Sequence, residues 1–168
     1  MKYNLVVIFL IFLPCIYSAP VGYKNVVLED SPVAFWRLSE SSGNTLVDAS
    51  GSGHHGTYYG PTLNQDGVSD GDSSARFDGV NDYAIVNDSA DFNFLNYTLE
   101  AWIKIEGSAV SHRRIISQQN SEYWLLHIND NKLTMYSSLD GTNNLRFGPD
   151  LNDGKWHHVV STRDTVND

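Results

Sequence analysis

The sequence predicts an all-β protein, folded as an antiparallel sandwich or barrel, and three observations support this prediction. Short segments rich in β-branched and aromatic residues recur along the chain. Clusters of Gly, Asn, Asp and Ser separate these segments, and such residues favour turns. No helical pattern alternates with the segments, so their pairing is expected to be antiparallel.

The N-terminal segment has the pattern of a secretory signal peptide. Lys2 precedes an apolar run at residues 5–13, which is too short to cross about 30 Å of hydrocarbon. The small residues Ser18 and Ala19 follow, and cleavage is expected after Ser18. An uncleaved anchor is the alternative. Since no second apolar span occurs later in the sequence, a secreted product without membrane insertion is expected.

Residues 19–30 form a lead-in, and residues 31–168 are expected to form one domain. Only residues 23–30 have the pattern of a short helix, which ends before Pro32. The expected strands are residues 33–38, 56–59, 75–77, 83–86, 97–105, 114–118, 123–128, 133–136 and 156–162.

Residues 97–105 show the clearest strand pattern. Leu99, Ala101, Ile103 and Ile105 alternate with more polar residues, which predicts a strand with one buried face. Turns are expected at residues 78–79 and 129–132, where Asn and Gly accept positive φ at low cost.

The charge and the cysteine content exclude some classes of protein. The chain has 20 acidic and 11 basic residues and a net charge of -9, which argues against nucleic acid and anionic membranes as partners. Its single cysteine, Cys15, lies in the expected signal peptide, so the mature chain is expected to lack disulfides. Asn87 and Asn96 each begin an N-glycosylation acceptor pattern.

Five sequence blocks resemble the laminin-G-like jelly-roll domain of the concanavalin A-like lectin/glucanase superfamily. In chain order they are FWRL (35–38), DASGSGHHGT (48–57), ARFDGVNDY (75–83), YTLEAWI (97–103) and GKWHHVV (154–160). The resemblance implies a two-sheet antiparallel jelly-roll sandwich, commonly secreted and used to recognise carbohydrate or protein. Similar domains continue into a further hairpin and a last strand, whereas this chain ends at Asp168. The domain is therefore expected to lack its C-terminal strands, and its unpaired edges to allow self-association or completion by a partner strand.

The loop at residues 48–56 is a candidate calcium site. Asp48, Ser50 and the backbone near Gly53 supply the hard oxygen ligands that calcium prefers. Similar domains often hold a structural calcium near this loop. The alternative is that Asp48 only caps the turn through backbone hydrogen bonds.

No catalytic pattern accompanies the fold. A glucanase needs two carboxylates within about 10 Å of each other. Glu100 and Glu106 share a strand face but are separated by about 20 Å at the rise of a strand. A glycoside hydrolase is therefore the least favoured function.

Binding is the favoured function, and the candidate ligand-binding residues are Tyr58, Tyr59, Asn81 and Trp102. Sugar rings stack on exposed aromatic side chains and form hydrogen bonds with amides and carboxylates. A glycan or an extracellular glycoprotein is the expected ligand. A structural or adhesive module that contacts protein without binding sugar remains the alternative.

Overall fold

The computed structural model describes residues 2–8, 22–68, 73–107, 113–118, 124–137 and 145–164. The helical elements are α1 (Tyr23–Glu29) and the 3₁₀ turn η1 (Ala90–Phe92). The strands are β1 (Lys2–Ile8), β2 (Phe35–Trp36), β3 (Thr45–Leu46), β4 (Gly56–Tyr59), β5 (Thr62–Asp66), β6 (Ser73–Phe77), β7 (Tyr83–Val86), β8 (Tyr97–Glu106), β9 (Arg113–Gln118), β10 (Trp124–Asn129), β11 (Lys132–Ser137), β12 (Leu145–Phe147) and β13 (Trp156–Arg163).

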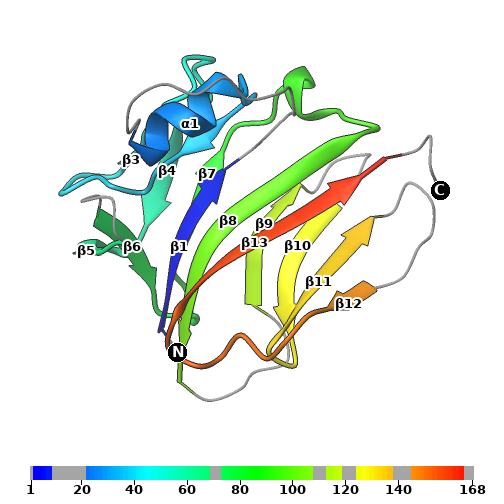
Figure 1. Ribbon diagram of the computed structural model, residues 1–168. Coiled ribbons are helices and arrows are strands. Elements are labelled where there is room, and N and C mark those ends of the chain that lie inside the picture. The colour runs from blue at the N-terminus through cyan, green and yellow to red at the C-terminus, as the bar shows by residue number, and fades with distance from the viewer. Residues whose placement is uncertain are drawn as a thin grey trace.

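The described strands form three antiparallel sheets. The large sheet has the order β13-β8-β1-β6-β5, and β2 also pairs with β1. A four-stranded sheet has the order β12-β11-β10-β9, and a three-stranded sheet the order β3-β4-β7. Figure 1 shows β8 and β13 crossing in front of the four-stranded sheet, as the two layers of a sandwich.

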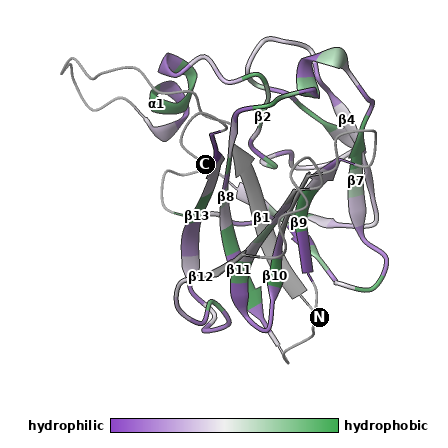
Figure 2. Ribbon diagram, turned by 90° about the vertical axis from the view of Figure 1, so that its right-hand side faces the viewer, coloured by the Kyte–Doolittle hydropathy of each residue, from purple (hydrophilic) through white to green (hydrophobic). Residues whose placement is uncertain are grey.

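The core lies on the inner face of the large sheet. Leu99, Ala101, Ile103 and Ile105 of β8 are each at most 2% exposed, which confirms the alternation predicted from the sequence. They belong to one buried cluster with Ile128 of β10, Leu46 of β3 and Tyr58 of β4. Both smaller sheets therefore pack on the inner face of the large sheet. Figure 2 shows hydrophobic and hydrophilic residues following one another along β8.

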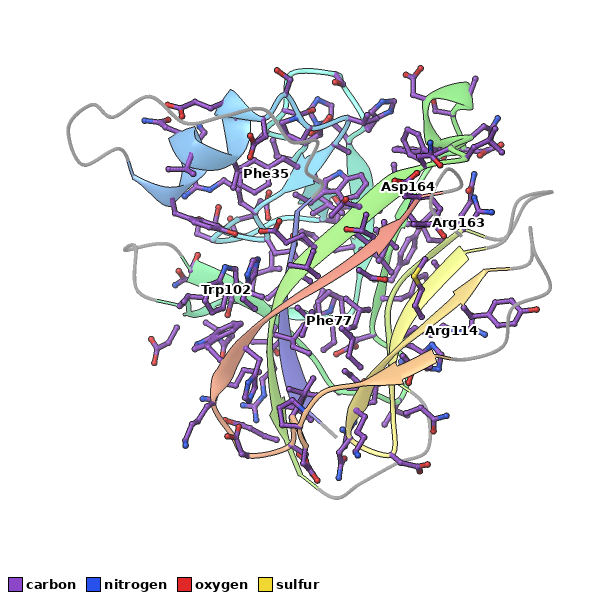
Figure 3. The ribbon with its side chains drawn as sticks, turned by 45° about the vertical axis from the view of Figure 1, so that its right-hand side comes forward. Phe35, Phe77, Trp102, Arg114, Arg163 and Asp164 are labelled. Carbon is purple, nitrogen blue, oxygen red and sulfur yellow. The ribbon has the colours of Figure 1, made fainter. Side chains whose placement is uncertain are left out.

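Helix α1 covers part of the opposite, outer face of the large sheet. Val27 and Phe35 are each 1% exposed and pack with Tyr23, Leu28 and Trp102. Neighbouring residues of β2 point to opposite faces, so Phe35 meets the helix while Trp36 enters the main core. Figure 3 shows Phe35 beside α1 and Phe77 between the two layers.

The structure confirms the all-β sandwich and most of its predicted elements. Helix α1, strands β4 and β7 and the long strand β8 lie where the sequence places them, within one residue at each end. Asp130 and Asn131 adopt positive φ in the turn between β10 and β11, as expected. The short strands β3, β5 and β12 are not among the predicted ones, because they lack a run of β-branched or aromatic residues.

Strand β1 lies within the segment at residues 1–18 that the sequence assigns to a signal peptide, of which residues 9–18 are outside the described ranges. A short apolar run fits either structure, and periodicity alone does not separate them. Its place in the sheet does not test whether the segment is cleaved, so the signal peptide, the secreted location and the missing C-terminal strands stay predictions. In the part of the chain that the structure describes, no helix is long and apolar enough to span a membrane.

Candidate functional site

The three-stranded sheet turns one face to the core and the other to solvent. Along β7, Ala84 and Val86 pack against the core, while Tyr83 and Ile85 are 48% and 50% exposed. In β4, Tyr58 is buried and Tyr59 is 45% exposed. The two strands pair with Tyr59 opposite Tyr83. Three large exposed side chains, Tyr59, Tyr83 and Ile85, therefore share one solvent-facing surface, named here the tyrosine face.

The two tyrosine rings stack on each other. Their centroids lie 4.7 Å apart and their planes differ by 18°. Stacking covers one face of each ring and leaves the other face for further contacts. Among the strands that the structure describes, β7 is an end strand of its sheet, and none of that sheet lies beyond Tyr83. Tyr83 is therefore accessible from solvent at the edge of this sheet.

A rigid acidic loop adjoins the tyrosine face. Asp78 Oδ1 accepts hydrogen bonds from the backbone N–H groups of Val80, Asn81 and Asp82, at 2.8, 3.2 and 3.3 Å. These bonds, chiefly those from Val80 and Asn81, lower the pKa of Asp78. Asp82 Oδ2 accepts the N–H of Asp78 in return, at 2.8 Å. The 78–82 loop therefore holds a fixed shape beside Tyr83, with Asn81 exposed.

Gly60, the residue after Tyr59, lies in close contact with Asp82. Gly60 has φ +90°, and a Cβ placed on it would lie 2.2 Å from Asp82 Oδ1. Only glycine allows this close approach. The carboxylate of Asp82 consequently lies beside the residue that follows Tyr59.

Of the four sequence-predicted ligand residues, Tyr59 lies on the tyrosine face and Asn81 lies in the adjoining 78–82 loop, two residues before Tyr83. Tyr58 lies in the core, where its hydroxyl donates to Glu40 Oε2 at 2.7 Å. Burial, followed by the hydrogen bond to Glu40, raises the pKa of Tyr58. A ligand on the tyrosine face would meet Tyr59 rather than Tyr58.

Trp102 lies elsewhere, on the outer face of the large sheet. Its Nε1 donates to Tyr23 Oη at 3.0 Å, and its ring stacks on His158 with centroids 4.9 Å apart. Tyr23 also donates to Glu100 Oε1, and His158 Nε2 lies 2.5 Å from the same oxygen. These contacts hold Trp102 in the packing of α1 on the sheet, away from the tyrosine face.

Both carboxylate oxygens of Asp48 accept hydrogen bonds from backbone N–H groups. Its Oδ1 accepts the N–H groups of Phe35 and Ser50, and its Oδ2 accepts the N–H of His54, each at 2.9 Å. Burial by itself would raise the pKa of Asp48, but these bonds outweigh it and the pKa is lowered.

The Asp48 geometry favours the turn-capping alternative over calcium. Backbone N–H groups point at both carboxylate oxygens of Asp48, where a cation would need free oxygen ligands. The Ser50 hydroxyl donates to the carbonyl of Val33 at 3.4 Å. Gly53 adopts φ +84° in an exposed turn. Within the described ranges, no group of three or more His, Cys, Asp and Glu residues is arranged to hold a metal. Calcium binding at Asp48, Ser50 and Gly53 stays a prediction.

The two predicted glycosylation sites are exposed. Asn87 follows Val86, the last residue of β7, and Asn96 precedes the first residue of β8. Their use stays a prediction.

Tyr83 and Ile85 are not among the ligand-binding residues predicted from the sequence. Their alternation with Ala84 and Val86 is visible in the sequence, but every residue of this short strand is apolar or aromatic. Such a strand does not reveal which of its faces is buried.

The family model for the laminin-G-like domain described as "Concanavalin A-like lectin/glucanases superfamily" matches residues 78–167, which is more than half of the chain. No curated protein and no solved structure matches. The matched residues include the 78–82 loop and the strands from β7 to β13. The chain therefore belongs to the concanavalin A-like lectin/glucanase superfamily, as a laminin-G-like module of the general kind that acts in lectin-like or protein recognition.

Proposed function

We propose that this protein is a secreted, non-catalytic recognition module that binds carbohydrate on its tyrosine face. The observation that carries the proposal is the stacked pair of Tyr59 and Tyr83, each nearly half exposed on the solvent side of the three-stranded sheet. Aromatic rings that a soluble domain leaves exposed next to polar loop residues are typical of binding surfaces.

The tyrosine face offers the contacts that a sugar needs. The apolar C–H face of a sugar ring can stack on the outer ring face of Tyr83, and Ile85 extends the apolar area along β7. The tyrosine hydroxyls, with the side chains of Asn81 and Asp82 in the adjoining 78–82 loop, supply hydrogen-bonding groups. The carboxylate and the net charge of -9 favour a neutral or amino sugar over a sulfated or sialylated one.

The carboxylates of β8 support a non-catalytic role. Glu100 is buried against His158 and Tyr23, and Glu106 pairs with Arg76 at 3.3 Å and with Lys104 at 2.8 Å. Each of these groups is held by structural contacts at a different position along the strand. A pair of carboxylates around a shared sugar bond needs a closer arrangement.

A second candidate function is protein binding without sugar, and the exposure of aliphatic residues favours it. Val80 at the tip of the 78–82 loop is 81% exposed, and Val47 after β3 is 41% exposed. Together with Ile85 they add aliphatic area that a sugar uses less well than a protein partner.

A glycan array probed with the full chain tests the proposal. We expect binding to neutral or amino glycans, and a loss on the order of tenfold for Tyr83→Ala, which corresponds to about 1.4 kcal/mol. Tyr83→Phe should retain most of the stacking contribution. Val160→Ala is the matched control, because Val160 is 45% exposed on a different face of the molecule. Glycan binding that is unaffected by both Tyr59→Ala and Tyr83→Ala would exclude the tyrosine face. An array without signals, combined with Tyr83-dependent capture of an extracellular protein, would favour the second candidate.

A further inference from the structure

The net negative charge of the chain is concentrated in the segment that forms the tyrosine face. Residues 38–103 contain ten Asp and Glu residues and a single Lys or Arg, Arg76, whereas the rest of the chain contains ten acidic and ten basic residues. Arg76 pairs with Glu106 on the large sheet, at 3.3 Å. Figure 1 shows β3 to β7, which belong to this segment, on the side of the molecule away from β11 and β12. The whole net charge of -9 therefore arises in this segment.

Most of these carboxylates are open to solvent. Asp48 and Glu100 are 4% and 6% exposed and form hydrogen bonds within the fold. The other described members of the group are at least partly exposed, and they are Glu40, Asp66, Asp78, Asp82, Asp88 and Asp91. Like charges gathered on one side of a protein produce a field that attracts cations and repels anions. This side of the molecule therefore favours a positively charged ligand.

Asp82 brings one of these charges to the stacked tyrosine pair. It precedes Tyr83 in the chain, and its Oδ1 lies so close to Gly60, the residue after Tyr59, that a Cβ there would collide with it. The carboxylate is thus at the same end of β4 and β7 as the stacked rings. Its Oδ2 accepts the N–H of Asp78, whereas Oδ1 accepts no hydrogen bond from the described residues. One carboxylate oxygen remains for a donor on the ligand.

We propose that the tyrosine face recognises a sugar that carries a protonated amine. This inference rests on the function proposed above and adds the charge of the ligand to it. An amino sugar presents an apolar C–H face and an ammonium group on one rigid ring. The C–H face stacks on Tyr83, and the ammonium group donates a charge-assisted hydrogen bond to Asp82 Oδ1.

Two other kinds of cation fit this surface less well. A metal ion needs several oxygen ligands around one point, and among the described residues no three acidic, His or Cys side chains are arranged in that way. A lysine side chain is a flexible four-carbon stem, which loses conformational entropy when it is held in one position. A sugar ring is already rigid, so it binds to a flat aromatic surface without this cost.

A matched pair of oligosaccharides tests the charge of the ligand. The β-1,4-linked trimer of glucosamine and its N-acetylated counterpart share one backbone, but only the first carries protonated amines in mildly acidic buffer. Calorimetry with the full chain at low ionic strength is expected to show about tenfold tighter binding of the glucosamine trimer. Tyr83→Ala should weaken the binding of both trimers, because both stack on the same ring.

Asp82→Asn separates the charge at the site from the charge of the whole molecule. Asparagine keeps an oxygen that accepts the N–H of Asp78, and the preference for the charged trimer should fall about fivefold. Asp150→Asn is the matched control, because Asp150 is exposed outside this segment and also accepts a backbone N–H, that of Asn152, at 2.8 Å. It removes the same charge and should change the preference by less than about twofold.

Four results would overturn the inference, and they differ in what they leave standing. Equal binding of the two trimers, lost in Tyr83→Ala, would keep the proposed function without the requirement for charge. If neither trimer binds, a Tyr83-dependent signal from other glycans would still support the proposed function, and its absence would remove both. Equal effects of Asp82→Asn and Asp150→Asn would attribute the preference to net charge alone. Trilysine that binds as tightly as the glucosamine trimer, with the same dependence on Asp82, would replace the amino sugar with a basic peptide.

Discussion

Two outward faces of this domain carry aromatic residues, and their surroundings differ. On the large sheet, Trp102 lies beneath α1, donates to Tyr23 and stacks on His158. On the three-stranded sheet, Tyr59 and Tyr83 stack on each other and remain nearly half exposed. An aromatic residue on the outer side of a strand thus contributes to stability where a helix covers it. Where nothing in the described part of the chain covers it, it is available for binding.

Removing Phe35 should have the largest effect on stability, because it anchors the covered face. Phe35 is 1% exposed between α1 and the sheet. Phe35→Ala is expected to lower the free energy of unfolding by about 3–5 kcal/mol. Urea denaturation measures this loss, and Phe35→Leu gives a milder variant if the alanine variant does not fold. Val160→Ala, on the exposed part of the same outer face, should change stability by less than about 0.5 kcal/mol. Similar losses for the two alanine variants would contradict the role assigned to α1.

Gly60→Ala tests the junction between the tyrosine face and the 78–82 loop. The substitution combines positive φ with a collision against Asp82, whose other carboxylate oxygen is bonded to the N–H of Asp78. We expect a loss of about 1–3 kcal/mol together with weaker ligand binding. Gly43→Ala separates the two causes, because Gly43 has φ +89° and no atom within 4 Å of its virtual Cβ. If both variants lose the same stability and neither loses binding, the contact with Asp82 has no role.

The carboxylate of Asp48 should make the free energy of unfolding depend on pH in the acid range. Its pKa is lowered in the folded chain, so its stabilising effect is complete above the unfolded value near 3.8 and is lost as the pH falls through the lower folded value. Asp30 acts in the opposite direction, because burial and then the charge of Glu100 raise its pKa. The difference between the parent chain and Asp48→Asn therefore isolates Asp48.

We expect Asp48→Asn to cost about 1–2 kcal/mol at pH 7, since it replaces a charged acceptor of three backbone bonds. The difference should shrink as the pH falls below 3.8, and thermal unfolding at several pH values measures it. A difference that is constant with pH would contradict the lowered pKa.

Tyr83→Ala should have the smallest effect on stability. Half of the side chain is already exposed, so only the stacking on Tyr59 and part of the burial are lost, about 0.5–1 kcal/mol. Denaturant unfolding measures this change, and the contrast with its effect on binding distinguishes a binding residue from a structural one. A loss of stability as large as that of Phe35→Ala would show that Tyr83 has a structural role like that of Phe35, so that the two faces do not differ in this respect.

Much of the secondary structure could be predicted because it depends on local chemistry. The alternation in β8 and the positive φ at Asp130 and Asn131 follow from residue types and spacing within a few positions. Less of the candidate site could be predicted. Tyr59 and Asn81 were expected to bind, but Tyr83 was not singled out and Trp102 belongs to a different face.

The sequence by itself determined the fold class, the order of most strands and the family, since β-branched runs, turn residues and the laminin-G-like blocks all lie along the chain. Tertiary structure alone decided which aromatic residue is exposed. A period of two places Tyr58 and Tyr59 on opposite faces without telling which face meets the core. Contacts between distant residues supply that information, as when Tyr23 of α1 covers Trp102, 79 positions later. Packing against other elements, rather than local propensity, therefore separates the structural aromatic residues from the exposed ones.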